Sequence, residues 1–285
     1  MKRGVLTILV GVLISATVRG EPFNLATFNI RCPADRGERS WAKRAPRCIK
    51  LVEMEHVEMM GVQEATPGQV SDLLKGLPGW AAVGCGRERD RGGESCSILY
   101  RKERFELLGH ETFWLSENPD QPGLRSWGSA YPRICTRARF RDRRGGAVFH
   151  YFNTHLDHVS PLARQKGMAL ILSRIREIPG NIPLILGGDM NAETRSPSAY
   201  KEGEGERIDP ISLATALLDD SAKCSLTPHQ GPLATYTGYR PTGGAMIDYL
   251  FVSKGIKIHS HKTCNTRFDG LCASDHDPVI IRVSF

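Results

Sequence analysis

The sequence lacks the features of a repeat protein or a disordered chain. It has no internal repeat and no extended low-complexity tract, and charged residues make up 24% of its 285 residues, close to the soluble average. Its Pro/Gly/Ser-rich interruptions are only of loop length, so no linker divides it. With 40% hydrophobic residues it can bury one substantial core, and we predict a single domain over residues 21–285.

The sequence has little that resembles a membrane span. After two basic residues, a run of about ten mostly apolar residues from Val5 to Ile14 is too short to cross a bilayer comfortably. The small residues Val18 and Gly20 precede Glu21. This pattern predicts a signal peptide over residues 1–20 and an exported protein, periplasmic or extracellular. An uncleaved anchor is the competing interpretation.

No C-x-x-C pair occurs among the eight cysteines, which argues against a structural zinc site. Their even number, together with export, favours disulfide bridges. Cys264 and Cys272 are close enough in sequence to close one loop, and Cys85 with Cys96 another. The sequence does not fix the pairing.

A strong excess of one charge sign is also missing. The net charge of +7 becomes 7 − 3 = +4 when Lys2, Arg3 and Arg19 leave with the signal peptide. That charge permits an anionic substrate without requiring one. Arginines gather at Gly86–Gly93 and Arg137–Arg144, where a solvated turn or strand face is favoured over a phosphate-binding groove.

Hydrophobic periodicity predicts alternating strands and helices first, and mostly strands later. Helices are expected over Ser40–Met54, from Pro67, and over Ala163–Ile175. Strands are expected at Phe23–Ile30, up to Glu64, at Ala81–Gly84, Cys96–Tyr100, Phe105–Leu115, Ile134–Arg141 and Val148–Thr154, up to Asp189, and in "MIDYLFVS" and "PVIIRVSF". Hairpins mixed with helical crossovers indicate an α+β or α/β sandwich, with two packed sheets and helices outside.

Polar side chains recur at the ends of these strands. They are Asn29, Glu64, His155, Asp189, Asn191, Asp248, Asp275 and His276. One strand-end Asp usually caps a turn, but so many together are typical of a site grafted onto a sheet core. Asn, Asp and Glu oxygens are hard ligands that suit Mg²⁺, Mn²⁺ or Ca²⁺. The histidines are then better placed near a phosphoryl oxygen than on the metal.

Six motifs carry a specific resemblance across Phe23–Phe285. In order they are "TFNI", "GVQEA", "FNTHLDH", "GGDMNAE", "MIDYLFVS" and "SDHDPV". Together they resemble the endonuclease/exonuclease/phosphatase superfamily, which includes pancreatic-type deoxyribonucleases, abasic-site endonucleases, sphingomyelinases, inositol-polyphosphate phosphatases and poly(A) deadenylases. The resemblance implies a four-layered sandwich of two mixed sheets flanked by helices. It also implies that Glu64 and Asp275, assisted by Asn29, hold Mg²⁺, with Mn²⁺ or Ca²⁺ as possible substitutes.

The same resemblance implies in-line attack by water on a phosphorus atom. Asp189 would orient and deprotonate the water, and Asn191 and His276 would stabilise charge on the phosphate oxygens. Asp248 would pair with His155, whose role as base, acid or electrostatic partner stays open.

Two further residues are candidate substrate contacts. Arg133 lies at a strand start where related nucleases place a phosphate-contacting arginine, although a solvated loop arginine is the alternative. Tyr236, like Trp127 and Tyr239, lies in a polar loop and could stack on a base or sugar. Ordinary loop packing is the competing interpretation for all three.

The leading functional hypothesis is a secreted, monomeric, metal-dependent phosphodiesterase that acts on nucleic acid. The second is the same chemistry on sphingomyelin or an inositol phosphate, weakened because the loop candidates hold only isolated aromatic residues. The third is a non-catalytic binding module of the same fold, against which the full set of site residues argues.

Overall fold

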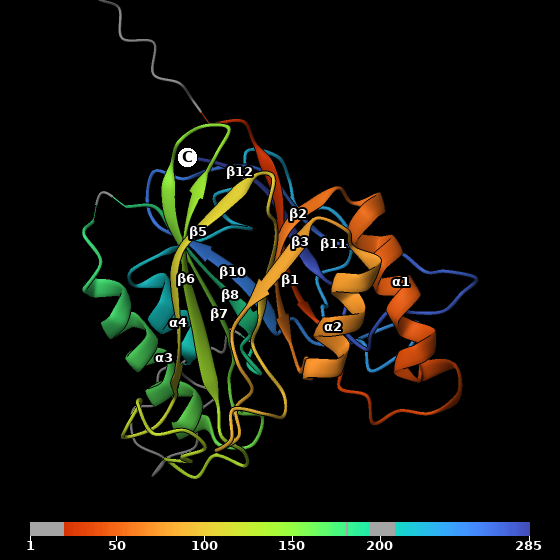
Figure 1. Ribbon diagram of the computed structural model, residues 1–285, viewed down its shortest axis with the longest axis horizontal. Coiled ribbons are helices and arrows are strands. Elements are labelled where there is room, and N and C mark those ends of the chain that lie inside the picture. The colour runs from red at the N-terminus through yellow and green to blue at the C-terminus, as the bar shows by residue number, and fades with distance from the viewer. Residues whose placement is uncertain (1–19, 181, 194–208) are drawn as a thin grey trace, which may run out of the picture.

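Two six-stranded sheets lie face to face in the computed structural model, which describes residues 20–180, 182–193 and 209–285 (Figure 1). The strand order is β11-β12-β1-β2-β4-β3 in the first sheet and β5-β6-β7-β8-β10-β9 in the second. The first sheet comprises β1 (Phe23–Asn29), β2 (Val57–Gln63), β3 (Trp80–Val83), β4 (Ile98–Arg101), β11 (Lys257–Thr263) and β12 (Val279–Ser284). The second comprises β5 (Phe105–Trp114), β6 (Ile134–Asp142), β7 (Val148–His155), β8 (Leu184–Asp189), β9 (Asp219–Asp220) and β10 (Asp248–Val252).

Helices cover the outer faces of both sheets (Figure 1). A short 3₁₀ turn (Gly37–Arg39) leads into α1 (Trp41–Met54), which lies with α2 (Pro67–Gly76) beside the first sheet. On the other side, α3 (Pro161–Arg176) and α4 (Pro210–Thr215) lie beside the second. The four-layered sandwich expected from the sequence is therefore confirmed.

Three apolar cores hold the layers together. The central core between the sheets is rich in aromatic rings, among them Phe105, Phe140 and Phe149, which are at most 1% exposed. The outer cores pack α1 and α2 on the first sheet and α3 and α4 on the second. Each fully buried large side chain of this kind contributes roughly 1.5–3 kcal/mol to folding.

Buried polar side chains also join the sheets and fix their spacing. On β7, Tyr151 donates to the Ala26 carbonyl of β1 at 3.1 Å. Two residues further, Asn153 donates to the Val62 carbonyl at 2.9 Å and accepts from Gln63 Nε2 at 2.7 Å. Gly61 is required opposite this network, because a Cβ there would lie 2.5 Å from the Tyr151 hydroxyl. A satisfied buried network of this kind favours a single register of one sheet on the other.

Some expectations about elements were incomplete. The sequence pattern missed β11, α4 and the two-residue β9. In α1 the expected inward residue Val52 is buried, whereas Ile49 and Trp41 are only half-buried and Cys48 and Leu51 lie deeper.

All eight cysteines lie within the described residues and all are free thiols. The expected bridges, including Cys85 to Cys96 and Cys264 to Cys272, are absent from the structure. The expected signal segment falls, apart from Gly20, on residues 1–19 and lies outside the described residues. Among the described helices, none is long and apolar enough to cross a membrane.

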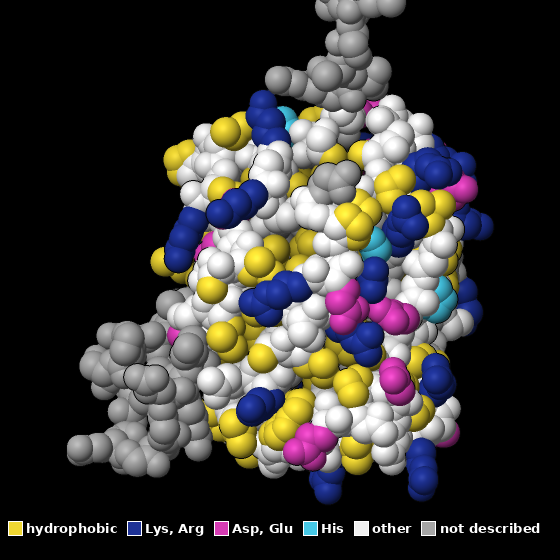
Figure 2. All heavy atoms as spheres, turned by 90° about the vertical axis from the view of Figure 1, so that its left-hand side faces the viewer, with side chains coloured by type: hydrophobic (Ala, Val, Ile, Leu, Met, Phe, Trp, Pro, Cys, Tyr) yellow, Lys and Arg dark blue, Asp and Glu magenta, His cyan; other side chains and the backbone are white. Residues whose placement is uncertain are grey.

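The arginines of β6 form a solvated strand face, as the sequence indicates. Arg137 pairs with Glu111 at 3.1 Å and Arg141 with Glu106 at 2.9 Å, across the β5–β6 ladder. Figure 2 shows basic and acidic side chains interspersed on this side of the molecule. Exposed pairs of this kind contribute little stability.

Candidate active site

Strand direction explains why the candidate residues meet. β1 runs parallel to β2, so Asn29 and Glu64 lie together at the carboxyl ends of these two strands. β7 runs parallel to β8, so His155 and Asp189, their last residues, also lie side by side. β10 is antiparallel to β8, which places its first residue, Asp248, opposite Asp189. All these ends face the same pocket.

Backbone geometry turns several of these side chains out of their strands. Gly188 has φ 150°, and a Cβ there would lie 2.0 Å from the Thr154 carbonyl oxygen, so β8 can approach β7 this closely only with glycine. The non-glycine residues Arg31, Glu64 and Asn191 adopt left-handed φ values of 56°, 58° and 46°. Such conformations are costly and gather at functional sites.

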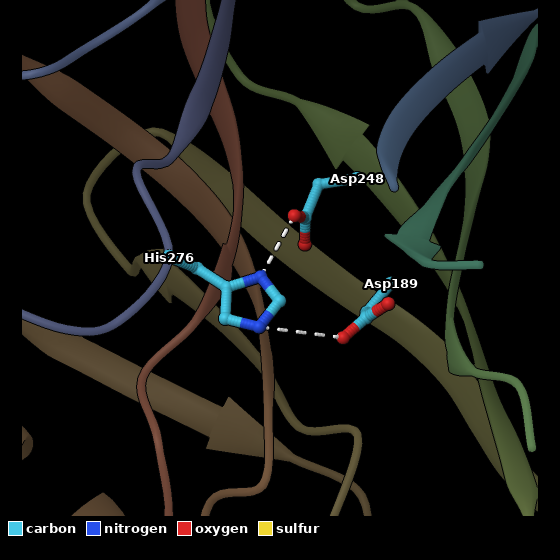
Figure 3. Close-up of side chains that lie close together, drawn as sticks. All are labelled: Asp189, Asp248 and His276. Atoms are coloured by element: carbon cyan, nitrogen blue, oxygen red, sulfur yellow. Dashed lines mark hydrogen bonds and ion pairs between the residues drawn. The ribbon is translucent and has the colours of Figure 1, made fainter. Parts of the chain in front are cut away.

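Asp248, His276 and Asp189 form a buried chain (Figure 3). His276 Nδ1 lies 2.8 Å from Asp248 Oδ2, and His276 Nε2 lies 3.7 Å from Asp189 Oδ2. The three side chains are at most 4% exposed. The expectation that Asp248 pairs with His155 is wrong, because the segment that leads into β12 brings His276 between the two carboxylates.

This chain carries a positive centre. Although burial alone would lower it, the neighbouring carboxylates of Asp248, Asp189 and Asp275 raise the pKa of His276 to about 10. Burial and the charge of Asp248 raise the pKa of Asp189 above its ordinary value. An imidazolium therefore faces a carboxylate that binds a proton more readily than usual, which suits proton transfer near neutral pH.

His155 is neutral and acts as an acceptor. Burial, followed by the charges of Arg133 and Arg87, holds its pKa well below 6.5. Its Nε2 lies 2.9 Å from Asn191 Nδ2, whose second hydrogen bond goes to the Leu156 carbonyl at 3.0 Å. His155 thus orients the Asn191 amide and carries no proton to donate from Nε2.

Glu64 and Asp275 form the acidic side of the pocket. Hydrogen bonds from Cys32 N–H at 2.9 Å and Asn29 Nδ2 at 3.0 Å hold Glu64, and they outweigh burial to lower its pKa. Burial raises the pKa of Asp275, and the nearby charge of Glu64 adds to the rise. Asn29 Nδ2 also donates to Asp189 Oδ2 at 3.0 Å. In this arrangement the Asn29 amide nitrogen positions two carboxylates, while its Oδ1 accepts from the Arg31 N–H at 3.0 Å.

Two groups of side chains have the donors for a divalent cation. The ligand atoms of Asp189, Asp248 and His276 lie within 4.8 Å of one another. However, the 2.8 Å contact between His276 and Asp248 is already a hydrogen bond, so this group is better described as a proton-bearing chain. Glu64 and Asp275 offer hard carboxylate oxygens at the pocket wall, and the cation would relieve their mutual repulsion.

These residues line a pocket of about 510 Å³. Eight of the ten expected site residues line the pocket, and the other two, Asn29 and Asp248, lie behind them and contact lining residues. The eight are Glu64, Arg133, His155, Asp189, Asn191, Tyr236, Asp275 and His276. The Tyr236 ring lies 5.0 Å from the His276 ring. Trp127 is half-buried away from the pocket, and the Tyr239 hydroxyl donates to Asp35 at 3.0 Å.

Arg133 is a buried pocket residue and not a solvated loop arginine. It is 5% exposed, with Nε 3.3 Å from Asp157 Oδ2 and Nη2 2.9 Å from His158 Nδ1. Its Nη1 is buried with no hydrogen-bond partner among the described residues. A guanidinium held in this way presents a free donor to an anion in the pocket.

Seven residues that line the pocket were not among the expected site residues: Arg31, Cys32, Arg87, Glu94, Tyr131, His158 and Ile247. Arg87 belongs to the first arginine-rich segment, which was expected to be a solvated turn, yet it is only 8% exposed and its guanidinium lies 4.7 Å over the Tyr131 ring. The glycine-flanked arginine cluster around Arg87 was the feature of the sequence that could have indicated an anion contact. Because a solvated turn was expected there, Arg87 was not predicted to line the pocket.

Comparison with known proteins agrees with this geometry. The sequence profile described as Endonuclease/Exonuclease/phosphatase family matches residues 26–276. Nocturnin of Drosophila melanogaster is 24% identical over 209 residues; the match covers 64% of this chain and only 31% of the length of that relative. An endonuclease/exonuclease/phosphatase of Bacteroides vulgatus superimposes with a TM-score of 0.82 at 30% identity, covering 92% of this chain and 98% of that one. A mannosyl-6-phosphatase of Bacteroides thetaiotaomicron gives 0.81 at 26% identity, covering 92% and 100%.

Proposed function

We propose that this chain, which belongs to the endonuclease/exonuclease/phosphatase family, is a divalent-metal-dependent hydrolase that cleaves phosphoesters by in-line attack of water. Members of this family are hydrolases that act on phosphoester bonds. The observation that carries the proposal is the Asp248–His276–Asp189 chain, which faces the Asn29–Glu64 pair across one pocket. In this proposal a proton acceptor and an imidazolium would both lie within reach of one bound phosphate.

Glu64 and Asp275 would hold the metal, with Mg²⁺ preferred and Mn²⁺ or Ca²⁺ as substitutes. The bound ion would supply Lewis-acid stabilisation of charge on the phosphate oxygens. The donor set fits, because both side chains are carboxylates at the pocket wall.

The other catalytic roles fall to side chains of the pocket. Asp189 accepts the proton of the attacking water, and its raised pKa keeps that transfer close to balance near neutral pH. The His276 imidazolium and the Asn191 amide stabilise negative charge on the non-bridging oxygens. His155 keeps the Asn191 amide in place, and Arg133 offers its free Nη1 to the substrate anion.

A nucleic-acid phosphodiester is the first substrate class that we propose, with Tyr236 as a contact for a base or sugar. A compact phosphomonoester is the second, because the pocket of about 510 Å³ has the size of a small-molecule site and a similar structure is a mannosyl-6-phosphatase. We also propose export, on the basic start and short apolar run of residues 1–20.

An assay panel tests the proposal. Purified protein with Mg²⁺ or Mn²⁺ is offered plasmid DNA, single-stranded RNA, sphingomyelin, bis-p-nitrophenyl phosphate and p-nitrophenyl phosphate, with EDTA as the metal-free arm. Asp189→Asn should lower turnover by at least about a hundredfold, since general-base groups contribute ~10²–10⁴-fold. The matched control is Glu193→Gln, whose carboxylate accepts from Met246 N–H at 3.2 Å. Hydrolysis that survives both EDTA and Asp189→Asn would contradict the proposal.

A further inference from the structure

Arg31 is a fixed part of the pocket wall. Its left-handed backbone is held on both sides, because its N–H donates to Asn29 Oδ1 at 3.0 Å and its carbonyl accepts from Gln69 Nε2 at 2.8 Å and Arg44 Nη2 at 2.9 Å. These contacts do not involve the Arg31 side chain. The surrounding fold therefore sets where the guanidinium begins and towards which side it extends.

The guanidinium lies among three carboxylates. Its Nε is 3.4 Å from Asp35 Oδ2 and 3.8 Å from Asp275 Oδ2, and its Nη1 is 3.7 Å from Glu64 Oε2. Asp35 is the anchor, because it also accepts from the Tyr239 hydroxyl at 3.0 Å. The two longer contacts exceed hydrogen-bond length, so Glu64 and Asp275 stay free to bind a cation. An arginine keeps its charge at any pH the protein meets.

A second divalent cation would find no uncompensated carboxylate in the described part of this pocket. Paired catalytic metals lie about 3.5–4 Å apart and share a set of carboxylates. Here, Glu94 is paired with Arg87 at 2.7 Å, and Asp189 Oδ2 accepts from Asn29 Nδ2 at 3.0 Å and lies 3.7 Å from His276 Nε2. Of the described carboxylates that line the pocket, this leaves Glu64 and Asp275, whose two charges balance one divalent ion. The Arg31 guanidinium lies 3.7 and 3.8 Å from them and would repel a second ion.

We propose that Arg31 limits this site to one divalent cation and lowers the affinity for that cation. The proposal rests on the proposed metal-dependent function and deepens it. A single, weakly held ion would be able to exchange between turnovers. The guanidinium would then keep Glu64 and Asp275 from repelling each other until the next ion binds.

Mn²⁺ binding to the purified full chain tests this inference directly. Isothermal titration calorimetry and the electron paramagnetic resonance signal of free Mn²⁺ both report the number of ions bound and the dissociation constant. The native chain should bind one Mn²⁺. Arg31→Gln should bind Mn²⁺ at least about tenfold more tightly, since it removes a unit charge that lies 3.7 and 3.8 Å from the two carboxylates that would hold the ion. Arg31→Asp, which suits the left-handed backbone, should bind a second Mn²⁺.

Arg36→Gln is the matched control, because it removes the same charge from the same loop at an exposed position. Its Mn²⁺ affinity should stay within about twofold of the native value, since exposed charges are screened. Arg31→Lys keeps the charge and should also bind one Mn²⁺ with near-native affinity, which provides a test even if Arg31→Gln does not fold.

The outcomes separate the two proposals. Two Mn²⁺ per native chain, or an Arg31→Gln affinity that is unchanged or weaker, would overturn the role of Arg31. The metal-dependent function would survive that result if Glu64→Gln still weakened Mn²⁺ binding. A native chain that binds no Mn²⁺ would overturn both proposals.

Discussion

Removal of the Asp248 charge should move the titration of His276 into the working pH range. The His276 Nδ1 and Asp248 Oδ2 atoms are 2.8 Å apart, so the charge centres lie about 4 Å apart. At an effective dielectric constant of about 20 this attraction is worth about 4 kcal/mol, or roughly three pKa units. In Asp248→Asn the pKa of His276 should therefore fall from about 10 to roughly 7.

The assay is the pH profile of kcat/KM on a p-nitrophenyl phosphoester at constant metal concentration. If the imidazolium is the active form, Asp248→Asn should lose roughly 30-fold more kcat/KM at pH 8.5 than at pH 6, because only about 3% of its His276 stays protonated at pH 8.5. The native enzyme should show no such decline until pH approaches about 10. The control is Asp220→Asn, which removes a buried carboxylate on the neighbouring strand β9. Parallel profiles for Asp248→Asn and the native enzyme would refute the reasoning.

The same pKa shift has a consequence for stability. The folded state binds the His276 proton more tightly than the unfolded state, whose histidine titrates near 6.5. Stabilisation from this proton is therefore fully present below pH 6.5 and is lost as the pH rises through about 10. In Asp248→Asn this stabilisation should be lost at a lower pH than in the native protein.

Two further predictions follow from the buried contacts. His155→Gln keeps a neutral acceptor for Asn191, so it should retain kcat within about tenfold and leave the acid limb of the pH profile unchanged. His155→Ala removes that acceptor and should lower kcat by ~10²-fold. If the acid limb disappeared in His155→Gln, His155 would instead be a titrating catalytic group. Arg104 pairs with Glu58 at 2.7 Å and with the buried Asp142 at 3.1 Å. Arg104→Ala leaves both carboxylates without this partner, so it should lower the free energy of unfolding by roughly 3–5 kcal/mol in urea titrations. A loss below about 1 kcal/mol would contradict this.

Most of the fold was readable from the sequence because its strands are apolar and end at polar residues. β8, for example, is buried along its whole length and ends at Asp189. β11 escaped notice because "KIHSHKT" is polar and carries a register shift at Ile258 to Ser260 that breaks the alternation. The burial of β11 comes from its pairing with β12 and with the loop at Gln230. Hydrophobic periodicity does not report such contacts.

The sequence indicated which residues belong to the site better than it indicated which of them pair with each other. Each candidate residue follows or precedes a strand, so its presence near the pocket follows from local sequence. The partner of Asp248 depends on how the segment before β12, a strand of the first sheet, packs against β10 of the second sheet. Local sequence does not report such a contact between sheets. Arg87 was missed for a related reason, since its guanidinium is buried by Tyr131, a residue 44 positions away in sequence.

The site is divided between the two sheets, and this division explains why the inter-sheet network matters. Asn29 and Glu64 come from the first sheet, whereas His155 and Asp189 come from the second. A single amide spans the divide, because Asn29 Nδ2 donates to Glu64 on one side and to Asp189 on the other, at 3.0 Å each. A hydrogen bond tolerates only a few tenths of an ångström of stretch, so the sheets must hold their spacing to that tolerance. The buried polar contacts between β7 and β1–β2 supply rigidity, and under the proposed function this rigidity would let one half of the site hold a cation while the other half moves a proton.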